Sequence, residues 1–207
     1  MVRSLGTILV AMAIYGFSAG SVDSLRMALW TLAKFPLVIY LTSTLCALAW
    51  WVLARFLTSG LSFRATLGLA LRTFADASVM LASLAPVNLF LGRTIVQPTP
   101  DALNEYPLYQ GLNVLFVAVC GTVAVVRQVC RMQKVHHLTR RRAAGVAAAW
   151  LAVSLFVGGQ CAWFLRPLYG CSAFPGVPFI LGNAPVFRGA RSFYEAGYFY
   201  VNPPPLP

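Results

Sequence analysis

The stretch RRRAAGVAAAWLAVSLFVGGQCAWFLRPLYG, which runs from Arg140 to Gly170, decides the fold. Three arginines precede a long apolar run without a charged side chain, and Arg166 followed by Pro167 ends that run. A helix of about 20 apolar residues crosses the roughly 30 Å hydrocarbon core of a bilayer. Arginines that flank such a helix mark the side that stays in the cytoplasm. The stretch therefore predicts a transmembrane helix over residues 143–165 that begins at the cytoplasmic face.

The overall composition places the rest of the chain in the same environment. Of its 207 residues, 59% are hydrophobic and only 10% are charged, whereas a soluble domain carries about 25% charged residues. One soluble core of this size cannot cover so much apolar surface, and lipid is the natural solvent for the excess. The sequence predicts an all-α integral membrane protein with a single membrane domain over residues 1–207.

The chain is strongly basic, and this charge indicates which partners it can bind. It holds 16 Lys+Arg against 5 Asp+Glu, a formal net charge of +11. The basic residues are spread along the chain at the ends of apolar runs, a pattern that sets topology and meets anionic lipid headgroups. We therefore expect a bilayer with anionic headgroups, together with a protein partner or a second copy of the chain, and not a nucleic acid.

The apolar runs predict a bundle of about five transmembrane helices, over residues 5–19, 37–54, 67–91, 108–126 and 143–165. Pro86 is expected to kink the third run. Gly16 and Gly20 form a Gly-x-x-x-Gly pair in the first run, which lets another helix approach closely but is common by chance. Two further segments flank the last span, a basic loop over residues 127–142 and an aromatic, Pro-rich tail over residues 166–207.

Residues 21–35 follow a different pattern. On a helical wheel several apolar side chains share one arc and most polar ones lie opposite, and Pro36 is expected to end the segment. This predicts an amphipathic helix in the headgroup plane, and the alternative is a simple extension of the next span. The apolar arc consists of Leu25, Ala28, Leu29 and Leu32.

The basic loop sets the predicted topology. Residues 127–142 carry six basic side chains and no acid, so the loop is expected in the cytoplasm. Alternation along five spans then places the N terminus in the cytoplasm and the tail on the extracytoplasmic side.

Arg72 and Asp76 are charged residues inside the third predicted span. Their i, i+4 spacing places both side chains on one face of a helix, where they can form an ion pair. A lone charge at the bilayer centre costs roughly 2.5–3.5 kcal/mol on insertion scales, so such groups tend to be paired and functional. We expect an Arg72–Asp76 pair, either as a gate or ion site or, as we favour, as a structural pair near the cytoplasmic end.

Three amide side chains lie in or near the spans, namely Asn88, Asn113 and Gln160. Such groups can line a pathway, but more often they form hydrogen bonds between helices and hold a bundle together. Their predicted depths place all three towards the outer half, so a polar cluster between spans three, four and five is expected.

The basic loop and the end of the last span are expected to contact lipid headgroups or a partner. The adjacent residues His136 and His137 are interpreted as part of this basic surface, because zinc sites need spaced ligands. Whether Cys161 and Cys171, ten positions apart, form a disulfide stays open. The expected contact residues are Arg127, Arg131, Lys134, Arg140, Arg141, Arg142, Trp163 and Arg166.

Motifs for catalysis are absent from the sequence. It contains no Gly-rich phosphate loop, nucleophile elbow, paired carboxylates or His-Glu-x-x-His, so we expect no enzyme, no cofactor and no metal site. The favoured hypothesis is a non-enzymatic scaffold or accessory subunit of a membrane complex, which makes contacts through residues 21–35 and the tail. The alternative is a small oligomeric channel or transporter that uses Arg72, Asp76 and the amides of the outer half.

Several segments resemble a family of uncharacterised bacterial multi-pass inner-membrane proteins: KFPLVIYLT, LASLAPVNLF, GLNVL, and GGQCAWFLRPLYG followed by SFYEA. The resemblance covers about residues 15–198, and its most specific part is the Trp-x-Leu-Arg-Pro segment at Trp163 to Pro167. It implies a location in the bacterial inner membrane and transfers no catalytic residue. In span count the chain is also similar to Yip-type five-helix membrane proteins.

Overall fold

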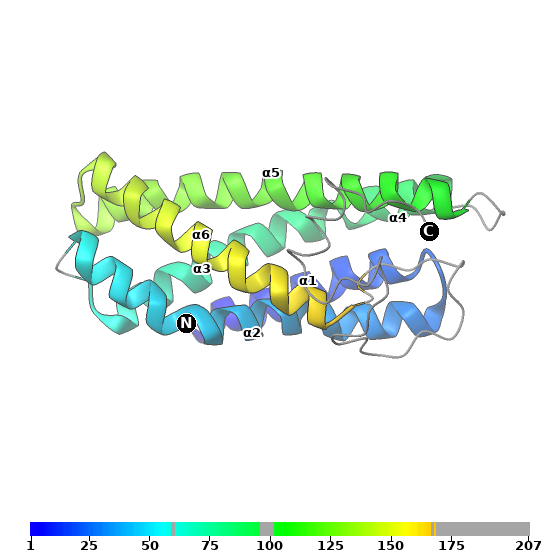
Figure 1. Ribbon diagram of the computed structural model, residues 1–207, viewed down its shortest axis with the longest axis horizontal. Helices are drawn as coiled ribbons and strands as arrows, with labels where there is room; N and C mark the ends of the chain where they lie inside the picture. Colours follow the sequence, from blue (N-terminus) through cyan, green and yellow to red (C-terminus); the bar gives the residue numbers. More distant parts are fainter. Residues whose placement is uncertain (59–60, 96–101, 167, 169–207) are drawn as a thin grey trace, which may run out of the picture.

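The computed structural model describes residues 1–58, 61–95, 102–166 and 168, and this part of the chain is all-helical. The predicted all-α fold class is confirmed. The helices, shown in Figure 1, are α1 (Val2–Gly20), α2 (Leu25–Thr58), α3 (Phe63–Ser83), α4 (Ala85–Ile95), α5 (Ala102–His136) and α6 (Arg140–Phe164).

The helices form an elongated bundle whose members run in alternating directions, with α3 and α4 together making one pass (Figure 1). The α2–α3 and α5–α6 connections therefore lie at one end, and the α1–α2 connection lies at the other. Five helices, α1, α2, α3, α5 and α6, are long and apolar enough to cross a membrane. This count confirms the predicted number of apolar spans.

The first difference from the prediction lies at Pro36. The helix does not end there, because α2 continues from Leu25 through this proline to Thr58. Both halves of α2 pack on α1: Thr31 Oγ1 donates to the Gly16 carbonyl at 2.7 Å, and the Tyr40 hydroxyl donates to the Leu5 carbonyl at 2.8 Å. Neighbouring helices stabilise a helix across a missing backbone hydrogen bond in membrane proteins, so packing overrides the proline. The segment after the first span is thus an extension of the second span, and its interfacial position stays a prediction.

The predicted third span over residues 67–91 is two helices. α3 ends at Ser83, and the amide of Leu84 donates to the Leu81 carbonyl at 3.0 Å in a final tight turn. Pro86 then occupies the second position of α4, where the missing N–H costs little because the first helical amides have no intrahelical acceptor. The proline disturbs this span as expected, but by a break instead of a kink.

The predicted basic loop is also mostly helical. α5 runs on to His136 and α6 begins at Arg140, so only three residues connect them. His137 adopts a positive φ of 51°, and the amide of Leu138 reaches back to the Met132 carbonyl at 3.4 Å. Arginine, lysine and glutamine are good helix formers, and Met132 is fully buried among residues of the neighbouring helices. Composition alone made this segment look like a loop. At its other end α5 begins at Ala102, six residues before the predicted start of the fourth span at residue 108.

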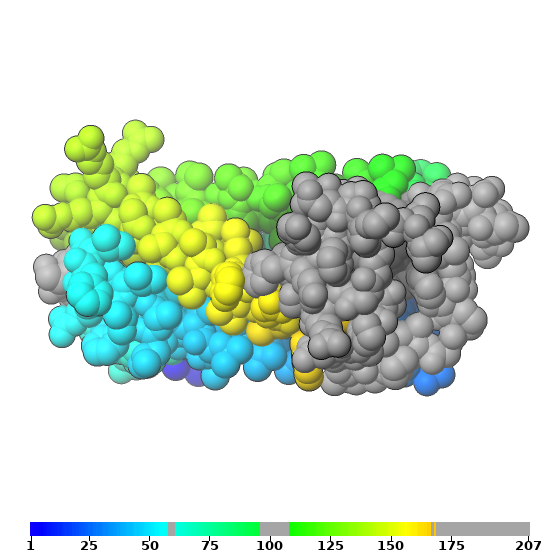
Figure 2. Space-filling model, in the orientation of Figure 1, coloured from blue at the N-terminus to red at the C-terminus, as the bar shows by residue number. Residues whose placement is uncertain are grey.

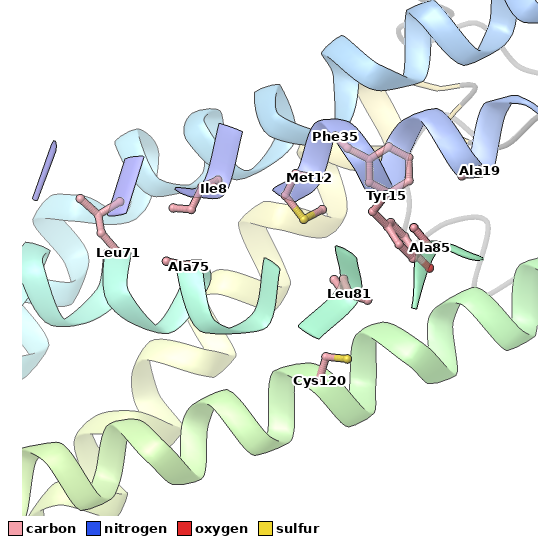
Figure 3. Close-up of a cluster of buried hydrophobic side chains, with 10 residues drawn as sticks. All are labelled: Ile8, Met12, Tyr15, Ala19, Phe35, Leu71, Ala75, Leu81, Ala85 and Cys120. Atoms are coloured by element: carbon pink, nitrogen blue, oxygen red, sulfur yellow. The ribbon is translucent and has the colours of Figure 1, made fainter. Parts of the chain in front are cut away.

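Two apolar clusters hold the bundle together. In the first, one face of α1 packs against α3 and its neighbours, as Figure 3 shows for Ile8, Met12 and Tyr15 against Leu71 and Leu81. The other members drawn there are Ala19, Phe35, Ala75, Ala85 and Cys120.

The second cluster joins α2, α3 and α6 around two tryptophans. Trp150 Nε1 donates to the Trp50 carbonyl at 2.8 Å, and Trp50 Nε1 donates to Ser154 Oγ at 3.2 Å. The ring of Phe74 on α3 lies 5.8 Å from that of Trp50. Both indole N–H groups are thus satisfied inside the bundle, as buried polar groups require.

The outer surface carries many large apolar side chains. On α2, Leu48 is 67% exposed and Phe56 is 86% exposed, and on α6 Leu155 and Phe156 are each 63% exposed. These two helices lie side by side on the face shown in Figure 2. A soluble monomer rarely exposes so much apolar surface, whereas the hydrocarbon of a bilayer covers it without cost.

Candidate functional site

Asp76 forms an ion pair between two helices. Its Oδ2 accepts a hydrogen bond from Arg131 Nη2 on α5, and this is the salt bridge present in the described residues. The expected Arg72–Asp76 pair is therefore wrong. Spacing places Arg72 and Asp76 on one face of α3, but Arg131 lies opposite on the antiparallel helix α5 and reaches the carboxylate from there.

The ion pair lines a recess of about 310 Å³ where α1, α3 and α5 meet. Arg72 points into the same recess, so the predicted pair of residues does share one site. Arg3 and two hydroxyl side chains of α1 complete the polar wall. The full lining is Arg3, Ser4, Thr7, Arg72, Ala75, Asp76, Val79 and Arg131.

Positive charge dominates this recess, because three arginines face one carboxylate. Arg131 Nη2 binds Asp76, while Arg131 Nη1 is buried without a hydrogen-bond partner among the described residues. The first turn of α1, which includes Arg3 and Ser4, has no acidic residue and no side-chain cap. Its amides add the positive end of a helix dipole to the same wall. The site is thus a set of hydrogen-bond donors with an excess of positive charge.

A separate polar cluster holds α1, α4 and α5 together. The Tyr15 hydroxyl donates to Asn113 Oδ1 at 2.7 Å, and Asn113 Nδ2 donates to the Tyr109 carbonyl at 2.9 Å. Asn88 Nδ2 donates to Ser18 Oγ at 3.2 Å. Both asparagines are fully buried. Asn88 and Asn113 thus each form a hydrogen bond to α1, as amides within a helix bundle commonly do.

Gln160 does not join these amides. It lies on α6, which packs against α2 and α5 and makes no close backbone contact with α1 or α4 within the described ranges. The membership of Gln160 in the expected three-membered cluster therefore gains no support and stays a prediction. The partners that the sequence did not reveal, Tyr15 and Ser18, lie on α1, and their i, i+3 spacing was the available signal that they share a face.

The predicted headgroup-contact residues fall into two groups. Arg131 is only partly exposed and is engaged by Asp76. Arg166 folds back on the end of α6, where its Nε donates to the Trp163 carbonyl at 2.8 Å and its guanidinium carbon lies 3.3 Å from the centre of that indole ring. The exposed side chains of the set are Arg127, Lys134, Arg140, Arg141 and Arg142. Headgroup contact stays a prediction for all of them.

Metal and disulfide chemistry gain no support from the described ranges. They contain no group of three or more His, Cys, Asp or Glu side chains that could hold a metal ion. Cys161 is a buried free thiol, and Cys171 lies outside the described residues together with most of the tail 166–207. The open question of a bridge between these cysteines is unchanged.

The fold and the recess define a class: an all-helical protein with five long apolar helices, typical of multi-pass membrane proteins, and a basic site between three of them. No protein-family model matches the chain, and no curated protein or solved structure matches it either. The resemblance to a bacterial family with a Trp-x-Leu-Arg-Pro segment therefore stays a prediction.

Proposed function

We propose that this protein is a non-enzymatic scaffold or accessory subunit of a membrane complex. It crosses the bacterial inner membrane five times, with its N terminus in the cytoplasm and its C terminus outside. The basic α5–α6 connection then lies in the cytoplasm, as the distribution of arginines favours. This surface holds an anionic partner protein, and the outer tail and the start of α2 provide further contacts.

The observation that carries the proposal is the helical form of residues 127–142. A flexible loop that carries arginines and a lysine loses backbone conformational entropy when it binds a partner. Here the segment is a hairpin of two helices joined by three residues and fixed by the buried side chains of Met132, Ala143 and Val146. The backbone that carries its cations is therefore ordered before binding, which lowers the entropic cost of recognising an acidic surface.

Co-purification tests this function. The chain, extracted in mild detergent, is expected to bring down a stoichiometric protein partner. The triple variant Arg140→Gln, Arg141→Gln, Arg142→Gln is expected to co-purify with at least about tenfold less of that partner, because it removes three cations from the hairpin. A matched control, Arg55→Gln with Arg64→Gln and Arg93→Gln, removes the same charge at other exposed positions and is expected to retain the partner. A chain that purifies alone, or a control that loses the partner equally, would contradict the scaffold function.

A further inference from the structure

We propose that the recess between α1, α3 and α5 is a binding site for a phosphate group. The donors are the guanidinium groups of Arg3, Arg72 and Arg131 and the hydroxyl of Ser4. The inference rests on the proposed function only for the membrane location, and it assigns a ligand to a recess that shares only Arg131 with the basic segment 127–142.

The charge of the recess selects an anion. Asp76 can neutralise only one of the three arginines, and it is already bound to Arg131. Guanidinium groups bind phosphate through paired N–H donors and do so better than lysine, because their fork matches the phosphate oxygens. A cation would be repelled by the arginines of this wall, and a neutral ligand would leave their charge uncompensated.

The pairing with Asp76 also orients Arg131 at the wall of the recess. The Arg131 Nη2 group donates to the Asp76 carboxylate, which fixes the orientation of the guanidinium, and Arg131 itself lines the recess. Asp76 thus acts as the positioning residue of the site.

The start of α1 adds a second kind of donor. Arg3 and Ser4 belong to its first turn, which carries no acidic side chain. Amides at a helix N-terminus and their dipole favour a phosphate. The site thus combines a helix start with side chains from two other helices, α3 and α5.

The depth of the recess fits a lipid headgroup. The helical segments without a charged side chain that end at it are residues 4–20 on α1 and residues 77–92 on α3 and α4. At 1.5 Å per residue these are roughly 24–26 Å long, close to the roughly 30 Å hydrocarbon thickness. On this side of the bundle the recess therefore lies where the phosphates of one leaflet lie. A soluble phosphate compound has the same binding chemistry, and the experiment separates the two sources.

The test compares lipid and phosphate binding by the purified full chain. Native mass spectrometry measures the retention of phosphatidylglycerol, with phosphatidylcholine as the zwitterionic reference and with inorganic phosphate added as a competitor. The variant Arg3→Gln with Arg72→Gln keeps the Asp76–Arg131 pair intact, so its fold is preserved. We expect its affinity for phosphatidylglycerol to fall about tenfold or more, since charge-assisted hydrogen bonds are lost. The control Arg64→Gln with Arg93→Gln removes the same charge from exposed positions outside the recess and is expected to stay within about twofold.

Each outcome bears on the site. Loss of lipid in the recess variant, with no competition by free phosphate, assigns the site to a headgroup. Competition by free phosphate that the recess variant abolishes assigns it to a soluble phosphate compound. Equal binding by the wild type, the recess variant and the control would overturn the proposal. Because the isolated chain is used, a failure to find a protein partner would contradict the scaffold function and leave this result unaffected.

Discussion

Replacing Gly16 and Gly20 by alanine is expected to destabilise the bundle by about 2 kcal/mol or more. A methyl group at Gly20 would lie 2.6 Å from the Met27 carbonyl oxygen and 2.7 Å from the Ala28 Cα, and it would also meet Thr31 Oγ1. A methyl group at Gly16 would meet the Thr31 carbonyl oxygen and lie 3.0 Å from a ring carbon of Phe35. Most of these obstacles are backbone atoms of α2 that cannot turn aside, so the helices must separate. Overpacking of this kind costs typically about 1–3 kcal/mol per site and more where backbone must move, and most of that range exceeds the roughly 1 kcal/mol that alanine gains over glycine in a helix.

Thermal unfolding in mild detergent, followed by circular dichroism, measures the effect as a lower midpoint. The matched control is Gly68→Ala with Gly121→Ala, two helical glycines with no neighbouring atom within 4 Å of an added Cβ. This control is expected to keep or raise the midpoint, because only helix propensity changes. If both double variants unfolded at the same temperature, the close packing of α1 on α2 would be wrong.

Arg131→Gln is expected to have the second largest effect, a loss of about 1–2 kcal/mol. It removes the partner of Asp76 and leaves a carboxylate between helices. Breaking a fully buried pair costs about 3–5 kcal/mol, and the smaller value follows because the two side chains, Arg131 and Asp76, remain 31% and 23% exposed. The measurement is again the unfolding midpoint. Asp76→Asn with Arg131→Gln is expected to be more stable than Arg131→Gln alone, because no uncompensated charge remains.

Arg72→Gln provides the comparison, since it removes an arginine one turn from Asp76 on the same helix. We expect it to change the stability by less than about 0.5 kcal/mol, as for an exposed substitution away from a partner. An Arg72 variant as unstable as the Arg131 variant would show that the carboxylate is paired within α3 after all.

The sequence predicted the number of apolar helices because hydropathy and length report directly on membrane crossing. It was weakest where local rules compete with packing. Pro36 should end a helix, but the contacts of Thr31 and Tyr40 with α1 keep α2 helical on both sides of it. The basic residues 127–142 look like a loop by charge, yet Met132 is buried and the helices continue almost to the turn.

The site residues show the same limit. Arg72 and Asp76 stood out because charges are rare in spans, and both do line the recess. Their partners Arg3 and Arg131 lie far away in sequence, and periodicity within one helix carries no information on which helices become neighbours. Asn113 stood out because amides are rare in apolar spans. Its role as the acceptor for the Tyr15 hydroxyl was missed, because Tyr15 lies on a helix far away in the sequence.

The proposed five-span topology requires that the two ends of the bundle lie on opposite sides of the membrane. The direct measurement is cysteine labelling in intact cells with an impermeant maleimide, after replacement of the native cysteines. Asp23→Cys lies at the α1–α2 connection and Lys134→Cys lies near the α5–α6 connection, and both positions are exposed. The account predicts that Asp23→Cys is labelled from outside and that Lys134→Cys is labelled only after lysis. Labelling of both positions from the same side would contradict it.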